Sequence, residues 1–182
     1  MTQRLDYDLV HQAPEPLFLG ELPTTYAQVP APVVINVCGV YPAVAPPVRV
    51  LLSLPFLDVP DESMLPERAM IERFLAGVHV HARQGATYWH CHAGINRASF
   101  VSAAYLHLYR GVRVSEAIRT LRERRSPLVL CNPVFERALR EWYGGPDEQE
   151  FEPFSMDRYL EEVRRHLALA DIQERAIREQ DD

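Results

Sequence analysis

Short apolar runs alternate with proline and glycine through the first half of the chain, and this alternation restricts the fold more than any other feature of the sequence. Short runs of β-branched and other apolar side chains between such breakers are typical of buried strands. The sequence therefore predicts four short strands, which lie at Leu17–Leu19, Val33–Cys38, Val48–Leu54 and Thr87–His90.

The segment between the last two of these runs has the apolar spacing of a helix. Ile71, Phe74, Leu75 and Val78 recur at helical intervals, and Pro66 is placed to serve as a first-turn proline. A helix between two strands indicates that the strands pair in parallel. We therefore expect a single-domain α/β fold with a short, mainly parallel central β-sheet flanked by helices.

Helix caps and breakers divide the second half of the chain into three predicted helices. The first runs from about Arg97 to Arg110 and stops at Gly111. The second starts behind Ser115 as N-cap and ends just before Pro127. The third has Asn132 as N-cap, Pro133 at its first position and Gly144–Gly145 at its close.

The C-terminal region differs from the rest of the chain in charge and in pattern. Residues 146–182 hold 12 acidic residues and five arginines, whereas residues 1–145 hold 13 acidic residues and 14 arginines. After the acidic stretch PDEQEFEP, an amphipathic helix is predicted from Met156 to about Glu179. We expect one domain in residues 1–145, followed by an acidic linker and this helix. The helix would dock on its own domain, pair in a homodimer or bind another partner.

Composition counts against two classes of partner. Residues 1–145 are nearly neutral and lack the basic footprint of a nucleic-acid-binding protein. No apolar run approaches the ~20 residues that a membrane-spanning helix requires. Cys38, Cys91 and Cys131 are an odd number at irregular spacing, which argues against a disulfide framework and for a cytoplasmic protein. Cys38 is expected in the core, and Cys131 is expected to be structural.

The segment WHCHAGINRAS, residues 89–99, joins a predicted strand to a predicted helix. The first N–H groups of a helix have no partners within it, and together with the helix dipole they bind phosphate. Gly94 would let the backbone curl so that successive N–H groups converge on one anion. Arg97 can return its planar guanidinium to the same point and bind two phosphate oxygens.

A cysteine stands at the start of this loop. Thiols near helix N-termini and cations ionise more readily than free thiols. We therefore expect Cys91 to act as a thiolate that attacks phosphorus in line, while Arg97 offsets the charge on the equatorial oxygens. This chemistry needs no cofactor. His90 and His92 flank the cysteine, but the further ligands that a metal site requires are absent at the usual spacing.

The pattern His90-Cys91-x-x-Gly94-x-x-Arg97 resembles the signature of protein tyrosine phosphatases, and the short chain looks like the dual-specificity branch of that superfamily. The resemblance covers about residues 5–143. It implies that phosphorylated proteins or peptides are the substrates, chiefly at phosphotyrosine and also at phosphoserine or phosphothreonine. Three further segments are similar to that branch: Leu17–Thr25, Leu54–Ser63 and Ser126–Phe135.

The resemblance also implies roles for individual residues. The general acid of the family lies about thirty residues before the cysteine, which favours Asp58, with Asp61 as the competitor. This acid protonates the leaving oxygen and then activates water. His90 and Asn132 would support the phosphate-binding loop. The loop itself would consist of His92, Ala93, Gly94, Ile95, Asn96 and Arg97, with the side chains of His92, Ile95 and Asn96 at the rim.

One position departs from the pattern of the family. The residue after the arginine is usually a serine or threonine whose hydroxyl bonds the thiolate and assists breakdown of the phosphoenzyme, but here it is Ala98. Ser99 is turned by ~100° around the helix and should face elsewhere. We therefore predict a slow second step, visible as a burst of product before slow turnover.

Two alternative functions stay open. The pair Asn96-Arg97 is similar to the Asn-Arg pair of capping-type RNA triphosphatases, which share the signature, so the chain could be an RNA 5′-phosphatase. The nearly neutral body and the presence of a candidate aspartate count against this. A phosphate-binding pseudophosphatase is the other alternative, motivated by Ala98, although both Cys91 and Arg97 are retained.

Overall fold

The computed structural model describes residues 5–42, 48–146, 153–161 and 164. The chain divides into two compact units, Met1–Glu152 and Pro153–Asp182. In the second unit, residues 156–161 and 164 are helical. The rest of the helix expected up to Glu179 lies outside the described residues, so its docking or pairing stays a prediction.

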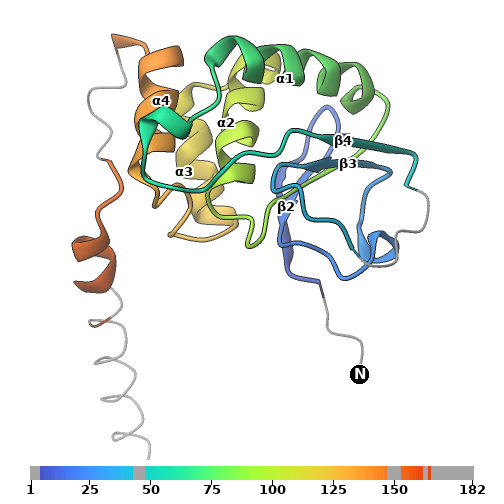
Figure 1. The fold of residues 1–182 in the computed structure, drawn as a ribbon, viewed down its shortest axis with the longest axis horizontal. Helices are drawn as coiled ribbons and strands as arrows, with labels where there is room; N and C mark the ends of the chain where they lie inside the picture. The colour runs from blue at the N-terminus through green and yellow to red at the C-terminus, as the bar shows by residue number, and fades with distance from the viewer. Residues whose placement is uncertain (1–4, 43–47, 147–152, 162–163, 165–182) are drawn as a thin grey trace, which may run out of the picture. The chain divides into compact units, whose positions relative to one another are not determined.

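The first unit is built on a five-stranded sheet (Figure 1). Its spatial order is β1-β2-β5-β3-β4, in which β1 is antiparallel to β2 and every other pair of neighbours is parallel. The mainly parallel sheet and the α/β class predicted from the sequence are therefore confirmed. The strands are β1 (Tyr7–His11), β2 (Leu17–Gly20), β3 (Val33–Asn36), β4 (Val50–Ser53) and β5 (Thr87–His90).

The edge strand β1 was not among the predicted strands. Its sequence YDLVH is too short an apolar run to stand out, since polar residues flank Leu9 and Val10, and within it only Val10 is fully buried. An antiparallel edge strand with one solvated face has this weaker pattern, because only every second side chain needs to be apolar. The strand carries Asp8, whose carboxylate accepts a hydrogen bond from Arg125 Nη1.

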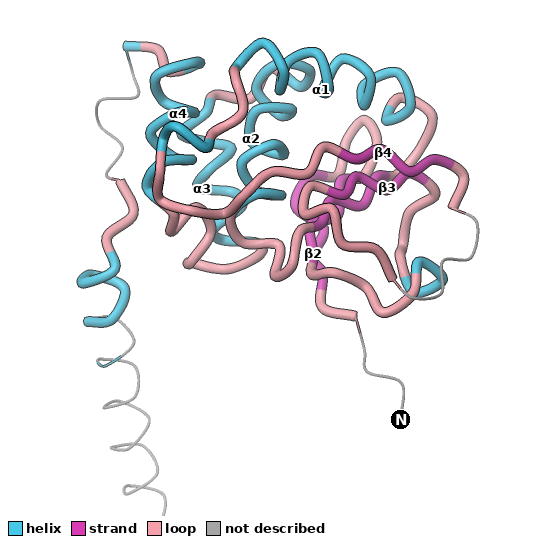
Figure 2. The backbone as a smooth tube through the Cα atoms, viewed as in Figure 1, coloured by secondary structure: helices cyan, strands magenta, loops and turns pink. Residues whose placement is uncertain are grey.

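Four helices pack on one face of the sheet (Figures 1 and 2). They are α1 (Arg68–Ala82), α2 (Arg97–Arg110), α3 (Val114–Arg124) and α4 (Pro133–Tyr143), and short 3-10 helices occur at Tyr26–Gln28 and Glu62–Met64. Leu19, Ile35 and Trp89 project from the sheet into this helical core, and all three are fully buried. The opposite face is covered by a smaller cluster around Tyr26, Val34 and Tyr88.

Helix boundaries follow the predicted caps at two of the four helices. The α2 helix ends at Gly111 with φ of 67°, a left-handed conformation that favours glycine. The α4 helix begins with Pro133, and the side chain of its N-cap, Asn132, accepts a hydrogen bond from the Val134 N–H. Local cap chemistry was sufficient to place these ends.

Two predicted helix starts were wrong. Arg113 is the N-cap of α3, so Ser115 lies inside the first turn; the buried Val114 takes the first helical position because the core requires an apolar side chain there. Pro66 lies outside α1, since Glu67 has extended ψ and is the N-cap. The Glu67 carbonyl accepts the first hydrogen bonds of the helix.

The register of the parallel strands places the candidate site. Gly20 of β2 and Asn36 of β3 both lie opposite His90, the last residue of β5. The three strands therefore end at the same edge, and the segments that follow them meet there. In open α/β sheets, ligands bind in the crevice beyond the carboxyl ends of the strands.

Candidate active site

Cys91 directly follows β5 and lies almost entirely buried at the sheet edge, 2% exposed. Residues 91–96 form the loop that connects it to α2. Gly94 has φ of 68°, and a Cβ at this position would collide with the backbone of Gly20 at the end of β2. The position therefore requires glycine both for its backbone conformation and for the close approach of two backbones.

The carbonyl groups of this loop point outward. Four of them accept hydrogen bonds from donors around the loop: His92 O from Leu22 N–H (2.9 Å), Ala93 O from Arg125 Nη2 (2.9 Å), Gly94 O from Ser99 Oγ (3.3 Å) and Ile95 O from Leu130 N–H (3.1 Å). The Cys91 carbonyl lies 3.4 Å from His90 Nδ1.

The backbone N–H groups of residues 92–96 donate no hydrogen bond within the part of the chain that the structure describes. Because each peptide unit directs its N–H opposite to its C=O, outward carbonyls leave these N–H groups turned inward. Convergent N–H groups at the start of a helix form a concave binding site for an anion.

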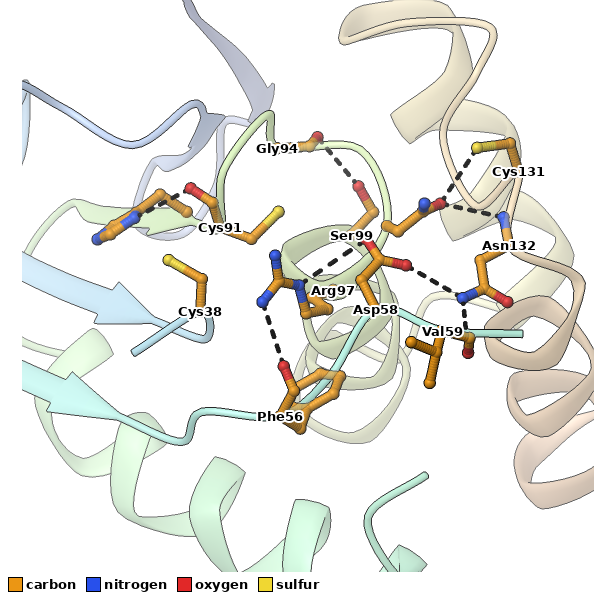
Figure 3. A network of polar contacts seen from close by, with 12 residues as sticks. Cys38, Phe56, Asp58, Val59, Cys91, Gly94, Arg97, Ser99, Cys131 and Asn132 are labelled. Carbon is orange, nitrogen blue, oxygen red and sulfur yellow. Dashed lines mark hydrogen bonds and ion pairs between the residues drawn. The ribbon is translucent and has the colours of Figure 1, made fainter. Parts of the chain in front are cut away.

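Arg97 is the first residue of α2 and is 8% exposed. Its Nη1 donates to the Phe56 carbonyl at 3.2 Å, which fixes one end of the guanidinium. Its Nε is buried and forms no hydrogen bond with any described residue. Figure 3 shows the guanidinium close to the side chain of Cys91. The donors of Arg97 that remain are thus available to an anion held by the loop.

Asp58 approaches the same site from the segment that follows β4. Its Oδ2 lies 3.8 Å from Arg97 Nε, and its Oδ1 accepts a hydrogen bond of 3.0 Å from Asn132 Nδ2. Asn132 Nδ2 also donates to the Val59 carbonyl at 3.1 Å (Figure 3). Asp61 instead caps the 3-10 helix Glu62–Met64, accepting from the N–H and the hydroxyl of Ser63.

Asn96 does not lie at the rim of the loop as predicted. Its Oδ1 accepts hydrogen bonds from Asn132 N–H at 3.1 Å and from Cys131 Sγ at 3.5 Å. The side chain is therefore directed into the protein, where backbone and thiol donors of the segment before α4 satisfy it. Through Asn132, the phosphate-loop residue Asn96 is connected to Asp58 by two consecutive hydrogen bonds.

His90 lies fully buried behind the loop. Its Nε2 is 3.4 Å from the Tyr26 hydroxyl, and burial lowers its pKa to about 4. The imidazole is therefore neutral at pH 7 and supplies one donor and one acceptor. Among the other rim positions expected from the sequence, His92 is exposed and Ile95 is half-buried.

Cys38 was expected in the core, but it lies at the candidate site. It follows β3 and is only half-buried, and its side chain occupies the same side of the site as Cys91 and Arg97 (Figure 3). Its Sγ lies 3.4 Å from Asn36 Oδ1. Partial burial raises the pKa of the Cys38 thiol. The apolar run VVINVC continues past the last strand residue, Asn36, and this concealed the position of the cysteine.

Arg125 was not among the residues predicted from the sequence to support this loop. It lies at the end of α3, 34 residues beyond the cysteine, and its role arises from contacts with residues distant in sequence: Asp6, Asp8 and Ala93. The run RERRS offers no local signal that separates this arginine from its neighbours.

Comparison with known proteins shows the family of this chain. A sequence model of the dual specificity phosphatase catalytic domain matches residues 20–144. The chain belongs to the dual specificity phosphatase family. Membership of this family identifies the chain as a cysteine-based phosphatase. No match is found among curated proteins.

Solved phosphatase structures share the fold of this dual specificity phosphatase. Human DUSP28 is 26% identical, with 79% of this chain and 95% of that chain covered and a TM-score of 0.60. DUSP15 is 20% identical, with 80% and 90% covered and a TM-score of 0.56. A mouse putative dual specificity phosphatase is 22% identical, with 75% and 89% covered and a TM-score of 0.54. The last two likenesses concern the fold alone.

The described residues contain no group of three or more His, Cys, Asp or Glu side chains arranged to hold a metal ion. None of the helices described in this phosphatase is long and apolar enough to cross a membrane.

Proposed function

We propose that this phosphatase hydrolyses phosphate monoesters in proteins, chiefly phosphotyrosine and also phosphoserine and phosphothreonine, through a phosphocysteine at Cys91. One observation carries the proposal. The side chain of Cys91 lies close to the Arg97 guanidinium (Figure 3), and the N–H groups of residues 92–96 donate no hydrogen bond within the described part of the chain, which supports an anion site beside this cysteine. The catalytic domain comprises residues 1–145.

In the first step, the Cys91 thiolate attacks phosphorus and forms the S–P bond while the bond from phosphorus to the leaving oxygen breaks. The inward N–H groups and Arg97 bind the equatorial oxygens, whose charge develops in the transition state. The Asp58 carboxyl donates its proton to the leaving oxygen, so the product departs as an alcohol or phenol.

In the second step, water attacks the phosphocysteine. The Asp58 carboxylate accepts a proton from this water, the S–P bond breaks, and inorganic phosphate leaves with Cys91 again a thiolate. Because Asp58 ends the cycle protonated, it is ready to serve as acid for the next substrate. Atoms and protons thus balance over the two steps.

We assign the acid to Asp58 in preference to Asp61 because of what each carboxylate contacts. Asp58 lies 3.8 Å from Arg97, and Asn132 orients it. Asp61 is engaged by two donors of Ser63 as a helix cap. A carboxylate held in a local cap is poorly placed to reach a leaving group beyond Cys91.

The second step proceeds without a hydroxyl beside Arg97. Ala98 is fully buried, and Ser99 Oγ donates to the Gly94 carbonyl instead of Cys91. The departing thiolate therefore lacks one hydrogen bond in the hydrolysis of the phosphocysteine. We expect the phosphoenzyme to accumulate and its breakdown to limit turnover.

Hydrolysis of a small aryl phosphate by the wild-type chain and by Cys91→Ser tests the proposal. We expect a burst of the phenol, a phosphoenzyme trapped by rapid acid quench, and loss of both in Cys91→Ser. A folded wild-type protein that binds tungstate without hydrolysing the ester would instead identify a pseudophosphatase.

Substrate class is tested separately. Phosphotyrosine, phosphoserine and phosphothreonine peptides are compared with triphosphate-ended RNA at equal concentration. We expect the phosphotyrosine peptides to give the highest kcat/KM. Preference for the RNA would overturn the protein-substrate assignment while leaving the phosphocysteine chemistry in place.

A further inference from the structure

Arg125 connects three parts of the chain that are far apart in sequence. It follows α3 as its C-cap residue, and its side chain is 5% exposed. Its Nη1 donates to Asp8 Oδ2 at 3.0 Å, and its Nη2 donates both to Asp6 Oδ2 at 2.8 Å and to the Ala93 carbonyl at 2.9 Å. A buried guanidinium thus joins two carboxylates at the sheet edge to the phosphate-binding loop.

The loop peptide that Arg125 contacts has a special freedom to rotate. The peptide group that joins Ala93 to Gly94 directly precedes the Cα atom of Gly94, and φ of Gly94 is 68°. Glycine populates several regions of backbone conformation, so this peptide can turn at less steric cost than its neighbours. A turned peptide would bring the Ala93 carbonyl dipole into the anion cradle and withdraw the Gly94 N–H from it.

No other described group donates to the Ala93 carbonyl. The adjacent carbonyls are held differently: backbone N–H groups bind those of His92 and Ile95, and Ser99 within α2 binds that of Gly94. The orientation of the Ala93–Gly94 peptide therefore depends on the side chain of Arg125. This charged side chain must itself be held in place by other residues.

We propose that Arg125 is a positioning residue that keeps the Gly94 N–H directed at the phosphate, and that Asp6 and Asp8 hold Arg125 for this task. The proposal rests on the proposed function of the loop. It adds β1 and the end of α3 to the elements that hold the phosphate-binding loop in position. The two carboxylates fix the planar fork from two directions, because each binds a different nitrogen. Arg125 in turn lowers the pKa of Asp6 through its hydrogen bond, which keeps that carboxylate charged.

Arg125→Met tests the proposal, because methionine keeps an apolar stem and removes every donor. Arg110→Met is the matched control. Arg110 is similarly buried, 8% exposed, and binds a carboxylate, Glu15 Oε2, at 2.6 Å at the far end of α2. Both variants should lose thermal stability. A merely structural role for Arg125 would therefore give the two variants the same phenotype.

Tungstate binding separates the two interpretations. Its inhibition constant and the KM and kcat for an aryl phosphate are measured at a temperature where each variant is folded by circular dichroism. We expect Arg125→Met to weaken tungstate binding about tenfold, the size expected for one misdirected donor to a charged oxyanion. Arg110→Met should stay within about twofold of wild type by the same scale. Equal tungstate affinity in wild type and Arg125→Met would overturn the proposal.

Two milder variants keep the test decisive if Arg125→Met does not fold. Arg125→Lys retains the positive charge on a single donor nitrogen, and the double variant Asp6→Asn/Asp8→Asn retains the arginine but removes the charges that hold it. Each should weaken tungstate binding by about threefold, a partial loss of one charge-assisted bond. Wild-type affinity in both would contradict the proposal. Direct tungstate binding, measured by calorimetry, keeps the result independent of whether the wild-type chain hydrolyses the ester.

Discussion

The loop of residues 91–96 and the segment of residues 54–65 approach the same site, but they are held in very different ways. Every carbonyl from Cys91 to Ile95 has a hydrogen-bonding group of the surrounding protein next to it. In the segment 54–65, Leu57 is 53% exposed and Met64 is 47% exposed. We refer to these two parts as the cradle and the acid segment.

Among the described residues, polar contacts of the acid segment with the side chains that flank the cradle, Arg97 and Asn132, are few. Arg97 binds the Phe56 carbonyl and forms an ion pair with Asp58, and Asn132 binds Asp58 and the Val59 carbonyl. A group that is buried and fully bonded resists displacement, whereas an exposed segment with few bonds opens at small free-energy cost. We therefore expect the cradle to keep one conformation and the acid segment to move more readily.

Replacing Arg97 with lysine should have the largest effect. Lysine keeps a positive charge, but it cannot bind two phosphate oxygens with a planar fork. We expect kcat/KM to fall about 10³-fold for every ester, since transition-state charge is stabilised by the same group whatever departs. Arg68→Lys, at an exposed ion pair with Glu72, is the control. A loss of kcat/KM below tenfold would show that the cradle stabilises the transition state without a planar guanidinium.

Asp58→Asn should depend on the leaving group, unlike the change in the cradle. Asparagine can still accept the Asn132 hydrogen bond, but it has no proton to donate to the leaving oxygen. We expect about a 10²-fold loss of kcat/KM for phenyl phosphate and a much smaller one for an ester with an acidic phenol. The matched variant Asp61→Asn should retain activity. A larger loss in Asp61→Asn than in Asp58→Asn would exchange the two assignments.

The buried His90 should make the cradle side of the molecule sensitive to acid. Its pKa is about 4 in the folded protein and about 6.5 when exposed, so the unfolded chain binds more protons between these values. Stability from this residue is fully present above pH 6.5 and falls as the pH decreases towards 4. Between pH 7 and pH 5 the expected loss is about 2 kcal/mol, or roughly 30-fold in the folding equilibrium.

Urea unfolding at pH 7, 6 and 5 measures this effect. His90→Gln should flatten the pH dependence of the unfolding free energy, because glutamine does not titrate. Asn132 contacts the acid segment and does not titrate. Asn132→Ser should therefore leave the pH dependence of the unfolding free energy as in the wild type. Parallel slopes in wild type and His90→Gln would mean that other groups cause the acid sensitivity.

Asn132→Ser should separate the cap that this side chain forms on α4 from its contacts with the acid segment. Serine is a good N-cap and can replace the hydrogen bond to Val134 N–H, but it is too short to reach Asp58. We expect about a tenfold loss of kcat/KM for phenyl phosphate, the size of one lost hydrogen bond to a charged group, with little change in unfolding free energy. Asn132→Ala should add a loss of about 1 kcal/mol in stability from the missing cap. Unchanged activity in Asn132→Ser would show that the acid segment positions Asp58 by itself.

Ala98→Ser should have the smallest effect and the opposite sign. A hydroxyl beside Cys91 would stabilise the departing thiolate and raise steady-state kcat by about threefold to tenfold, the range of one hydrogen bond to a charge. The product burst should become smaller at the same time, because phosphoenzyme breakdown would no longer be slow. Rapid-mixing kinetics with an aryl phosphate measures both quantities. A linear progress curve in the wild type would already contradict a slow second step.

Local chemistry in the sequence was sufficient for most of the elements. The strands β2 and β5, the limits of α2 and the start of α4 follow from apolar runs, a C-terminal glycine and an Asn-Pro cap. The segment from His90 to Arg97 could also be recognised, because strand end, loop and helix start are contiguous. These features depend on residues within a few positions of one another.

Only the tertiary structure decided how the surroundings meet that segment. The carboxyl ends of β2, β3 and β5 lie at the same edge of the sheet. Gly20 therefore contacts Gly94, and Cys38 lies on the same side of the site as Cys91. The partners of Asp58 and of Arg125 lie 74 and up to 119 positions away in the chain. Spacing along a sequence carries no information on such contacts, because the path of the chain between them, and not the intervening residues, determines the distance.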